Sequence, residues 1–343
     1  MIRDKGGVRV VKLKDIAMTC GVSVSTVSRA LNGQTNPDKK KAASIRQKAR
    51  EMGYTPNDAA RTLKTRRSHN IGILYEDRMD HEFFGLLLNE LRASAEEHGN
   101  DMTFIRHSTR SEGSNYDERV RRRCLDGVVV VQADFNSADV IRLAAGSIPT
   151  VVIDHAYEGC DCVMNDNRGG MEALVSLAWE KGHRKIAFVH GDDSMVTRER
   201  LTGFYKRCAE LGVRVPEEYV ASCFFHDPKD CARAVVSLME GKDPPTCIFC
   251  PDDFGCLGAL RALEARGVRV PQDVSLAGFD GIRLGQMMSP PLTTYRQDAP
   301  QIARSVISRL LDAIDHPEDH RPRTVTVRGT LLPGETLGPA KPE

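Results

Sequence analysis

The strongest constraint on the fold is an alternation of strand-like and helix-like runs, which continues for about 260 residues from Asn70 onward. Short apolar runs predict buried strands at Ile71 to Tyr75, Gly127 to Val131 and Thr150 to Ile153, and a longer amphipathic run predicts a helix from Phe83 to Glu97. Strands separated by crossover helices pair in parallel. The length favours two such sheets, so the sequence predicts an α/β body of two doubly wound parallel-sheet lobes.

Polar and aromatic side chains follow the ends of these predicted strands. Ligands of open parallel sheets bind beyond the carboxyl ends of the strands, so two facing sheets form a cleft that closes on a small molecule. The candidate ligand-binding residues are Glu76, Asp77, Phe83, Asp154, Arg200, Phe225, Asp252 and Asp280. Carboxylates accept hydrogen bonds from hydroxyls, a guanidinium donates them, and aromatic rings stack on apolar sugar faces. The cleft therefore suits a hydroxyl-rich ligand such as a carbohydrate, although each residue alone also fits a helix N-cap or a strand-end turn.

A different pattern precedes the body. An apolar stripe at helical spacing predicts a first short helix, and it consists of Leu13, Ile16, Ala17 and Cys20. Gly21 suits a left-handed turn, and Ser23 suits the N-cap of a second helix that turns Val27 and Leu31 inward. Two short helices joined by a glycine-containing turn form a helix-turn-helix.

The outward face of the second predicted helix suits contact with DNA bases. Val24 can contact a thymine methyl group, Ser25 and Ser28 can bond bases or phosphates, and Arg29 can reach guanine or the backbone. A third, basic helix is predicted from near Asp38, with its inward face formed by Ala43, Ile45, Ala49 and Met52. A helical hairpin within a core is the structural alternative, but the small polar outward face argues against it.

Charge is divided unevenly along the chain. Residues 1–70 hold 16 lysines and arginines and 5 aspartates and glutamates, whereas the remainder holds 32 and 42, so the net charges are +11 and −10. A basic head on an acidic body indicates a polyanionic partner at the head only.

The headpiece motifs resemble those of the LacI/GalR family of bacterial transcriptional repressors. The matching segments are Leu13-x-Asp15-Ile16-Ala17, Gly21-Val22-Ser23-x-x-Thr26-Val27-Ser28-Arg29-x-Leu31-Asn32, Gly53-Tyr54-x-Pro56-Asn57 and Ala59-Ala60-Arg61-x-Leu63. The resemblance implies DNA contacts by Val24, Ser25, Thr26, Ser28, Arg29, Asn32, Tyr54, Asn57, Ala60 and Leu63. It also implies a hinge helix from Asn57 to Lys64 that forms on DNA, with Leu63 as the wedge in the minor groove, and apolar wedges of this kind kink DNA.

The resemblance continues through the body, carried by Asp126-Gly127-Val128, Gly182-His183-Arg184-Lys185-Ile186-Ala187 and Gly278-Phe279-Asp280. It implies an effector site with Asp154, Arg200, Asp252 and Asp280, together with Phe83 and Phe225. The chain departs from the family at Asp252, where asparagine is usual, and at Gly281, where a second aspartate is frequent. A palindromic operator implies a homodimer, and the segment from Gly334 to Glu343 lacks the leucine heptads of a tetramer-forming coiled coil.

These observations predict a sequence-specific DNA-binding repressor with the following organisation. Residues 1–11 form a disordered arm, 12–56 the headpiece, 57–68 the hinge, 69–336 the periplasmic-binding-protein-like body and 337–343 a tail. Lobe 1 is expected at about 69–163 and 297–325, and lobe 2 at about 164–296 and 326–336. Effector binding between the lobes is expected to switch operator affinity.

Several alternatives remain open from the sequence. A sugar-processing enzyme is disfavoured because the chain lacks a Gly-x-Ser-x-Gly elbow and the glycine motifs of nucleotide sites. An extracellular solute-binding protein is disfavoured by the missing signal segment and the basic head, so a cytoplasmic location is expected. The ten cysteines, including Cys247-x-x-Cys250 and Cys160-x-Cys162, are expected to be reduced packing residues. No membrane span, metal, cofactor or catalytic residue is expected. A regulator controlled by a protein partner, or working without a ligand, stays open.

Overall fold

The computed structural model describes residues 11–31, 39–54, 67–76, 81–105 and 115–341. By its contacts the chain divides into two units, residues 1–68 and 69–343, called the headpiece and the body below. Several sequence-predicted residues lie outside the described ranges, together with most of the predicted arm and hinge: Asn32, Asn57, Ala60, Leu63 and Asp77.

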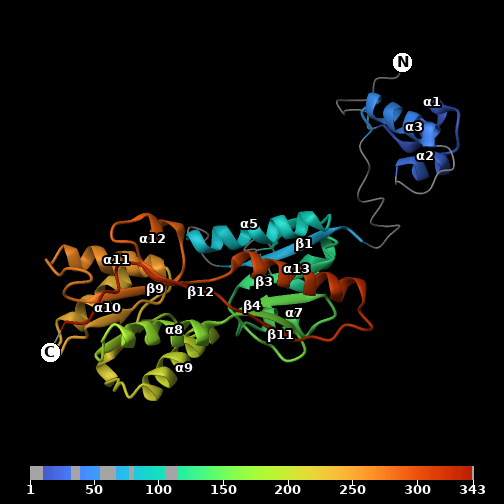
Figure 1. Cartoon of the computed structure of the whole chain (residues 1–343). Helices are drawn as coiled ribbons and strands as arrows, with labels where there is room; N and C mark the ends of the chain where they lie inside the picture. Colours follow the sequence, from blue (N-terminus) through green and yellow to red (C-terminus); the bar gives the residue numbers. More distant parts are fainter. Residues whose placement is uncertain (1–10, 32–38, 55–66, 77–80, 106–114, 342–343) are drawn as a thin grey trace. The chain divides into compact units, whose positions relative to one another are not determined.

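The described part of the headpiece contains α1 (Leu13–Cys20), α2 (Val24–Leu31) and α3 (Lys39–Glu51), drawn in Figure 1. The Lys12 backbone N–H donates to Asp15 at 2.8 Å and fixes the start of α1. Gly21 ends α1 at φ 63°, a left-handed conformation that favours glycine. The Thr26 backbone N–H donates to Ser23 Oγ at 3.2 Å, which confirms the predicted N-cap of α2.

The headpiece core lies between the three helices. Its buried residues are Ile16, Ala17, Val27, Ala30, Ala42, Ile45 and Ala49. The prediction that Ala43 faces inward is wrong, because Ala42 is 5% exposed whereas Ala43 lies on the exposed face. Ala42, Ile45 and Ala49 recur at intervals of three and four residues, which places them on one side of α3.

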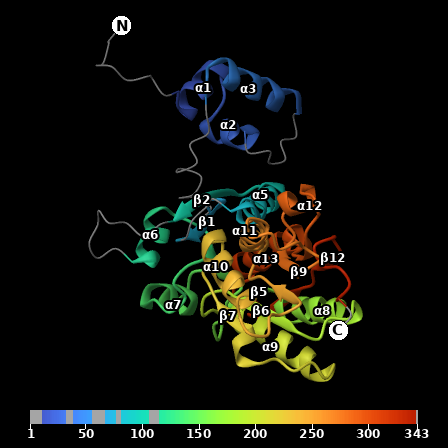
Figure 2. The same ribbon diagram turned by 90° about the vertical axis from the view of Figure 1, so that its left-hand side faces the viewer.

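Lobe 1 is a sheet covered by helices on both faces. The strand order is β11-β5-β4-β3-β1-β2, and every pairing is parallel. Its strands are β1 (Asn70–Tyr75), β2 (Asp101–Ile105), β3 (Gly127–Gln132), β4 (Thr150–Ile153), β5 (Asp161–Asn165) and β11 (Thr324–Val327). Its helices are α5 (Glu82–Glu97), α6 (Tyr116–Arg122), α7 (Ala138–Ala145) and α13 (Ala299–Asp315). Helices α5 and α13 pack together on one face (Figure 1), and α6 and α7 pack on the other (Figure 2).

Lobe 2 repeats this architecture. Its strand order is β12-β10-β9-β8-β6-β7, with β12 antiparallel to β10 and the other pairings parallel. Its strands are β6 (Ile186–His190), β7 (Val220–Ser222), β8 (Cys247–Phe249), β9 (Ser275–Asp280), β10 (Thr293–Arg296) and β12 (Thr330–Leu332). Its helical segments are α8 (Asn167–Glu180), α9 (Met195–Glu210), η1 (Glu217–Tyr219), α10 (Pro228–Met239), α11 (Asp253–Glu264) and α12 (Arg283–Met287). The pairs α8–α9 and α10–α11 cover opposite faces (Figure 1). The two lobes confirm the predicted fold class.

The chain passes between the lobes three times in the described body: after β5, between β10 and α13, and between β11 and β12. The predicted lobe limits at residues 163 and 325 fall inside β5 and β11, and both strands belong wholly to the sheet of lobe 1. These strands end at Asn165 and Val327, two residues after the approximate limits expected from the sequence.

The segment from residue 337, set apart as a tail in the sequence interpretation, packs on lobe 2. Leu337 is buried in the core beside α8 and β9, and the Gly338 N–H donates to Ser275 Oγ at 3.1 Å. The Ala340 N–H donates to the Lys181 carbonyl at 2.8 Å. Across the described residues, no helix combines the length and apolar character needed to cross a membrane.

Candidate functional site

The exposed face of α2 is the first candidate site. Val24, Ser25 and Arg29 are exposed, Thr26 and Ser28 are half-buried, and the opposite face enters the headpiece core through Val27 and Ala30. Val24 is 44% exposed, so its methyl groups are accessible on this face. Arg29 Nε lies 3.4 Å from the Ser25 carbonyl, so its side chain lies along the same face. An apolar contact, hydroxyls and a guanidinium therefore share the face expected to enter the major groove.

Tyr54 has a different environment. Its side chain packs against the headpiece core, its backbone N–H donates to the Ala49 carbonyl at 2.9 Å, and burial raises the pKa of its phenol. Its structural contribution is to close the core behind α3, and its role toward DNA stays a prediction.

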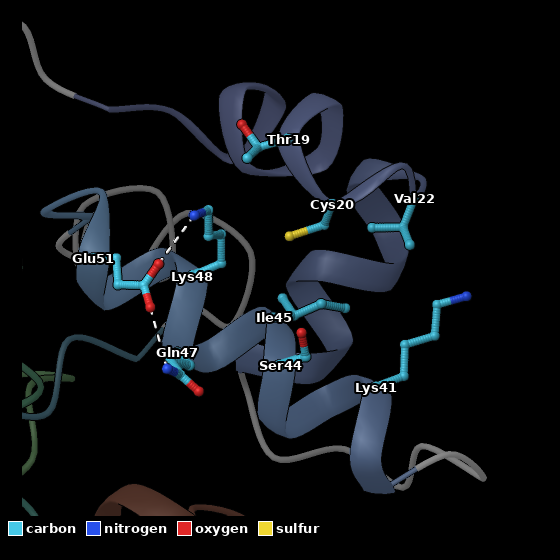
Figure 3. Close-up of a pocket in the computed structure, with 9 residues that line it drawn as sticks. All are labelled: Thr19, Cys20, Val22, Lys41, Ser44, Ile45, Gln47, Lys48 and Glu51. Carbon is cyan, nitrogen blue, oxygen red and sulfur yellow. Dashed lines mark hydrogen bonds and ion pairs between the residues drawn. The ribbon is translucent and has the colours of Figure 1, made fainter.

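A groove of about 340 Å³ lies between the α1–α2 turn and α3 (Figure 3). Cys20, Val22 and Ile45 line its apolar part. Lys48 Nζ donates to Glu51 at 3.0 Å, and Gln47 donates to the same carboxylate at 3.1 Å. Glu51 therefore offsets the charge of Lys48 within this groove.

The second candidate site is a cavity of about 320 Å³ between the two lobes of the body. Lobe 1 contributes loops that follow β1, β3 and β4, and lobe 2 contributes loops that follow β6, β7, β8 and β9. The sequence-predicted residues that line it are Phe83, Asp154, Arg200, Phe225, Asp252 and Asp280. The structure thus brings six predicted residues from both lobes to one cavity, as expected for the carboxyl ends of parallel strands.

Glu76 does not line the cavity. Its carboxylate accepts a hydrogen bond from the Tyr116 hydroxyl of α6 and another from the Asp134 N–H at 3.0 Å. These hydrogen bonds connect the end of β1 to α6 and to the loop after β3. Glu76 therefore stabilises lobe 1, whereas the sequence predicted that it would contact a ligand.

Arg200 is the central cation of the cavity. Its side chain is 5% exposed, and it enters from α9. Nε donates to Asn167 Oδ1 at 2.8 Å, and Nη1 donates to the Pro251 carbonyl at 2.5 Å. The guanidinium carbon lies 3.6 Å from the centroid of the Phe279 ring. These contacts fix the guanidinium in one orientation.

Asp280 of lobe 2 lies beside this guanidinium, and Asp154 of lobe 1 lines the same cavity. Asp280 Oδ1 lies 3.9 Å from Arg200 Nη2 and accepts a hydrogen bond from Gln297 Nε2 at 2.6 Å. Asp154 accepts from the Asn165 N–H at 3.0 Å. Burial raises the pKa of both carboxyls, and the nearby charge of Arg200 opposes this rise. Both have positive φ values, 57° and 111°, so each strand ends in a sharp turn that directs the side chain.

Asp252 holds the start of α11 at the cavity wall. Its Oδ1 accepts from the Gly255 N–H at 2.7 Å, and its Oδ2 accepts from the His226 N–H at 2.9 Å. The carboxylate is therefore both a helix cap and a clamp on the loop after β7.

Two contacts join the lobes beside the cavity. The imidazole rings of His81 and His226 stack with centroids 3.7 Å apart and an interplanar angle of 8°. Glu82, at the start of α5, accepts hydrogen bonds from the backbone N–H groups of Arg283 and Leu284 at 2.6 and 3.2 Å. Any ligand that changes the angle between the lobes must alter these contacts.

Several residues that line the cavity are not predicted from the sequence: His81, Phe135, His155, His226 and Gln297. Gln297 follows β10 directly, so the strand-end rule would have found it had that strand been predicted. The histidines lie in loops, where no sequence pattern distinguishes a lining side chain from an ordinary surface one.

The cysteines show no metal-binding arrangement. Cys160, Cys162, Cys247 and Cys250 are buried free thiols, and among the described residues no group of histidines, cysteines and acids is placed to hold a metal ion. Burial raises the pKa of Cys160 and Cys162 to about 12. These thiols pack as apolar side chains.

Asp253, buried beside the cavity wall, gives a pH-dependent prediction. Burial raises the pKa of its carboxyl to about 7. The Ile282 N–H donates to Oδ2 at 2.8 Å, and this hydrogen bond opposes the rise. Because the unfolded pKa is near 3.9, the folded state binds this proton more tightly, and stability falls as pH rises through the folded pKa. We expect this group alone to lower the free energy of unfolding by about 1.4 kcal/mol between pH 6 and pH 8.

The variant Asp253→Asn keeps an acceptor for the Ile282 N–H and removes the titration. Urea unfolding at pH 6 and pH 8 should show a flatter dependence in the variant than in the unmodified chain. Equal pH dependence in both proteins would show that Asp253 does not titrate in this range.

Two known families match successive parts of this chain. The family described as bacterial regulatory proteins, lacI family, matches residues 12–57, and the periplasmic binding protein-like domain matches residues 175–337. The chain is 30% identical over 308 residues to the HTH-type transcriptional repressor CytR of Escherichia coli, covering 88% of this chain and 89% of that protein. It is 29% identical over 312 residues to the HTH-type transcriptional repressor PurR of Haemophilus influenzae, covering 90% and 92%.

A solved structure shares the fold across the chain. The crystal structure of the lac repressor dimer bound to operator and the anti-inducer ONPF matches with a TM-score of 0.83 at 21% identity, covering 96% of this chain and 100% of that one. The headpiece helices, the two-lobed body and the 30% identity over nearly the whole length of a relative agree with the resemblance of the sequence motifs. The chain belongs to the LacI/GalR family of bacterial transcriptional regulators.

Proposed function

We propose that this chain is a cytoplasmic repressor that binds a palindromic DNA site as a homodimer and that a small polar molecule in the interlobe cavity switches its DNA affinity. The DNA-binding part is supported by the exposed polar face of α2 over an apolar core, in a headpiece with net positive charge. The lac repressor of the matching structure is a dimer bound to operator, and a dimer of this chain would read two half-sites in the same way.

The switching part rests on one observation above all: buried charged side chains from both lobes converge on one cavity. A buried arginine with carboxylates on either side is costly to build for stability alone. A ligand that contacts both lobes favours one lobe arrangement over another by the difference in its affinity for the two. The lining acids and aromatic rings suit a carbohydrate or a sugar derivative. We assign no catalytic role to these residues.

Arg29 offers a direct test of the DNA-binding face. DNA enriched from a random pool by the full chain should contain an inverted repeat. Arg29→Ala should weaken binding to that DNA by about 1–3 kcal/mol, because it removes a base or phosphate contact of α2. The measurement is a fluorescence anisotropy titration at fixed salt.

Arg304→Ala serves as the matched control. Arg304 is an exposed arginine of the body, and among the described residues its side chain hydrogen-bonds only Gln301. Its affinity should equal that of the unmodified chain. An Arg29→Ala protein that binds as tightly as the control would remove Arg29 from the proposed contact.

A ligand screen tests the switching part. The full chain in the presence of a true effector at about a hundred times its dissociation constant should gain roughly 2.7 kcal/mol of stability in the body transition. No stabilisation by any sugar, sugar derivative or nucleoside would favour the alternative of a regulator controlled by a protein partner or working without a ligand.

A further inference from the structure

The interlobe cavity has more buried negative charge than positive charge. Two arginines and no lysine lie among the described residues that line it. Arg200 is buried, whereas the side chain of Arg198 is 70% exposed and pairs with Asp193 at the rim. Against the single buried cation stand Asp252 at 1% exposure, Asp280 at 5% and the partly buried Asp154. One guanidinium cannot offset three carboxylates.

Most of the hydrogen-bonding groups of Arg200 already contact other residues of the protein. Its Nε and Nη1 donate to Asn167 and Pro251, one face of the guanidinium lies on Phe279, and Nη2 lies near Asp280. The charge of Arg200 is therefore matched most closely by one carboxylate. Asp154 and Asp252 also line the cavity, where they accept hydrogen bonds from backbone N–H groups, and His226 Nδ1 lies 3.7 Å from Asp252 Oδ2. Backbone donors are neutral, so they leave the charge of these two carboxylates in the cavity wall.

Gln297 places a further acceptor beside these carboxylates. Gln297 is 5% exposed, and its Oε1 is buried without a hydrogen-bond partner among the described residues. Its Nε2 is already used by Asp280. A buried acceptor without a donor costs free energy, so this side of the cavity wall is short of donors. Carboxylates are acceptors as well when ionised.

We infer that the cavity selects a cationic polar molecule, an amino-substituted polyol such as an amino sugar, over its neutral or anionic counterparts. An ammonium group supplies both the missing charge and three donors. The rings of Phe83, Phe135 and Phe225 line the same cavity and favour a cation further. This inference rests on the proposed effector function and narrows its chemistry.

A matched set of hexoses tests the charge preference in the full chain. Glucose, galactose and mannose would each be compared with the 2-amino-2-deoxy sugar, the 6-phosphate and the uronic acid by calorimetric titration at pH 7. The amino form should bind at least about tenfold more tightly than the neutral form, because a charge a few ångströms from a buried carboxylate interacts strongly. The phosphate and the uronic acid should bind more weakly than the neutral sugar.

Two other outcomes distinguish failure of the charge preference from failure of the proposed effector function. Neutral or anionic forms that bind as tightly as the amino form would overturn the charge preference and leave the proposed effector function standing. Absence of binding by every form, neutral, cationic and anionic, would count against both.

The variant Asp154→Asn tests whether the charge preference depends on Asp154. Asp154→Asn keeps an acceptor for the Asn165 N–H and replaces the other carboxylate oxygen by an amide. The ratio of amino-sugar to neutral-sugar affinity should fall about tenfold, because one cavity charge is lost. Asp243→Asn is the control, since this carboxylate is 67% exposed, pairs with Lys185 away from the cavity lining and is screened by solvent. Its ratio should stay within about twofold of the unmodified chain. An unchanged ratio in Asp154→Asn would overturn the inference.

Discussion

Arg200→Met is expected to destabilise the body by about 3–5 kcal/mol at pH 7.5. Methionine fills a similar space, but it removes the one buried cation among Asp154, Asp252 and Asp280 and leaves Asn167 and the Pro251 carbonyl without their donor. Urea unfolding followed by circular dichroism measures the change. The variant should also lose the stabilisation that a bound effector gives the unmodified chain.

The pH dependence of this loss identifies its cause. Because the carboxyls of Asp154 and Asp280 have raised pKa values, they take up protons as pH falls, and the uncompensated charge disappears. The difference in the free energy of unfolding between Arg200→Met and the unmodified chain should therefore become smaller as pH falls. Arg198→Met, at the exposed rim, should change stability by less than about 0.5 kcal/mol. A loss of stability that is equal for both variants, or absent in Arg200→Met, would contradict the central role of Arg200.

Ala42→Glu is expected to abolish DNA binding by unfolding the headpiece. Ala42 is 5% exposed within a small core, and a carboxylate there loses its water without gaining a partner. Since small domains are stable by only a few kcal/mol, we expect affinity for the enriched DNA to fall by at least about a hundredfold. The body should keep its ligand response, because it forms a separate unit.

Ala43→Glu makes a closely matched control. It introduces the same side chain at the next residue and changes the net charge equally, but it lies on the exposed face of α3. Its DNA affinity should fall by less than about tenfold, the effect of one added negative charge near a polyanion. If Ala43→Glu were the more damaging of the two, the inward orientation of Ala42 on α3 would be wrong.

The sequence was sufficient for the fold and for most of the cavity because both depend on local patterns. Apolar runs predicted parallel strands, and parallel strands end at one edge, so Asp154, Arg200 and Asp280 could be grouped from the order of residues along the chain. The capping role of Ser23 followed from a hydroxyl beside the first turn of a helix.

The details that failed depend on contacts between distant residues. Glu76 stands at a strand end like Asp154, but the Tyr116 hydroxyl, 40 residues later, draws it away from the cavity. Two adjacent alanines, Ala42 and Ala43, fit a helical stripe almost equally, and only packing against α1 and α2 decides between them. The last residues look like a tail, yet His183, far earlier in the chain, bonds the Gly338 carbonyl at 3.1 Å and holds them on lobe 2.

The most direct test of the switch is the affinity of the full chain for its enriched DNA, measured with and without a saturating amount of a ligand that stabilises the body. We expect the dissociation constant to change by at least about fivefold, in either direction, because the ligand and the DNA favour lobe arrangements of the same two-state body. The change should be lost in Arg200→Lys, which keeps the charge but not the planar donors that bond Asn167 and Pro251. Equal DNA affinity with and without a ligand that demonstrably occupies the cavity would contradict the proposed switch.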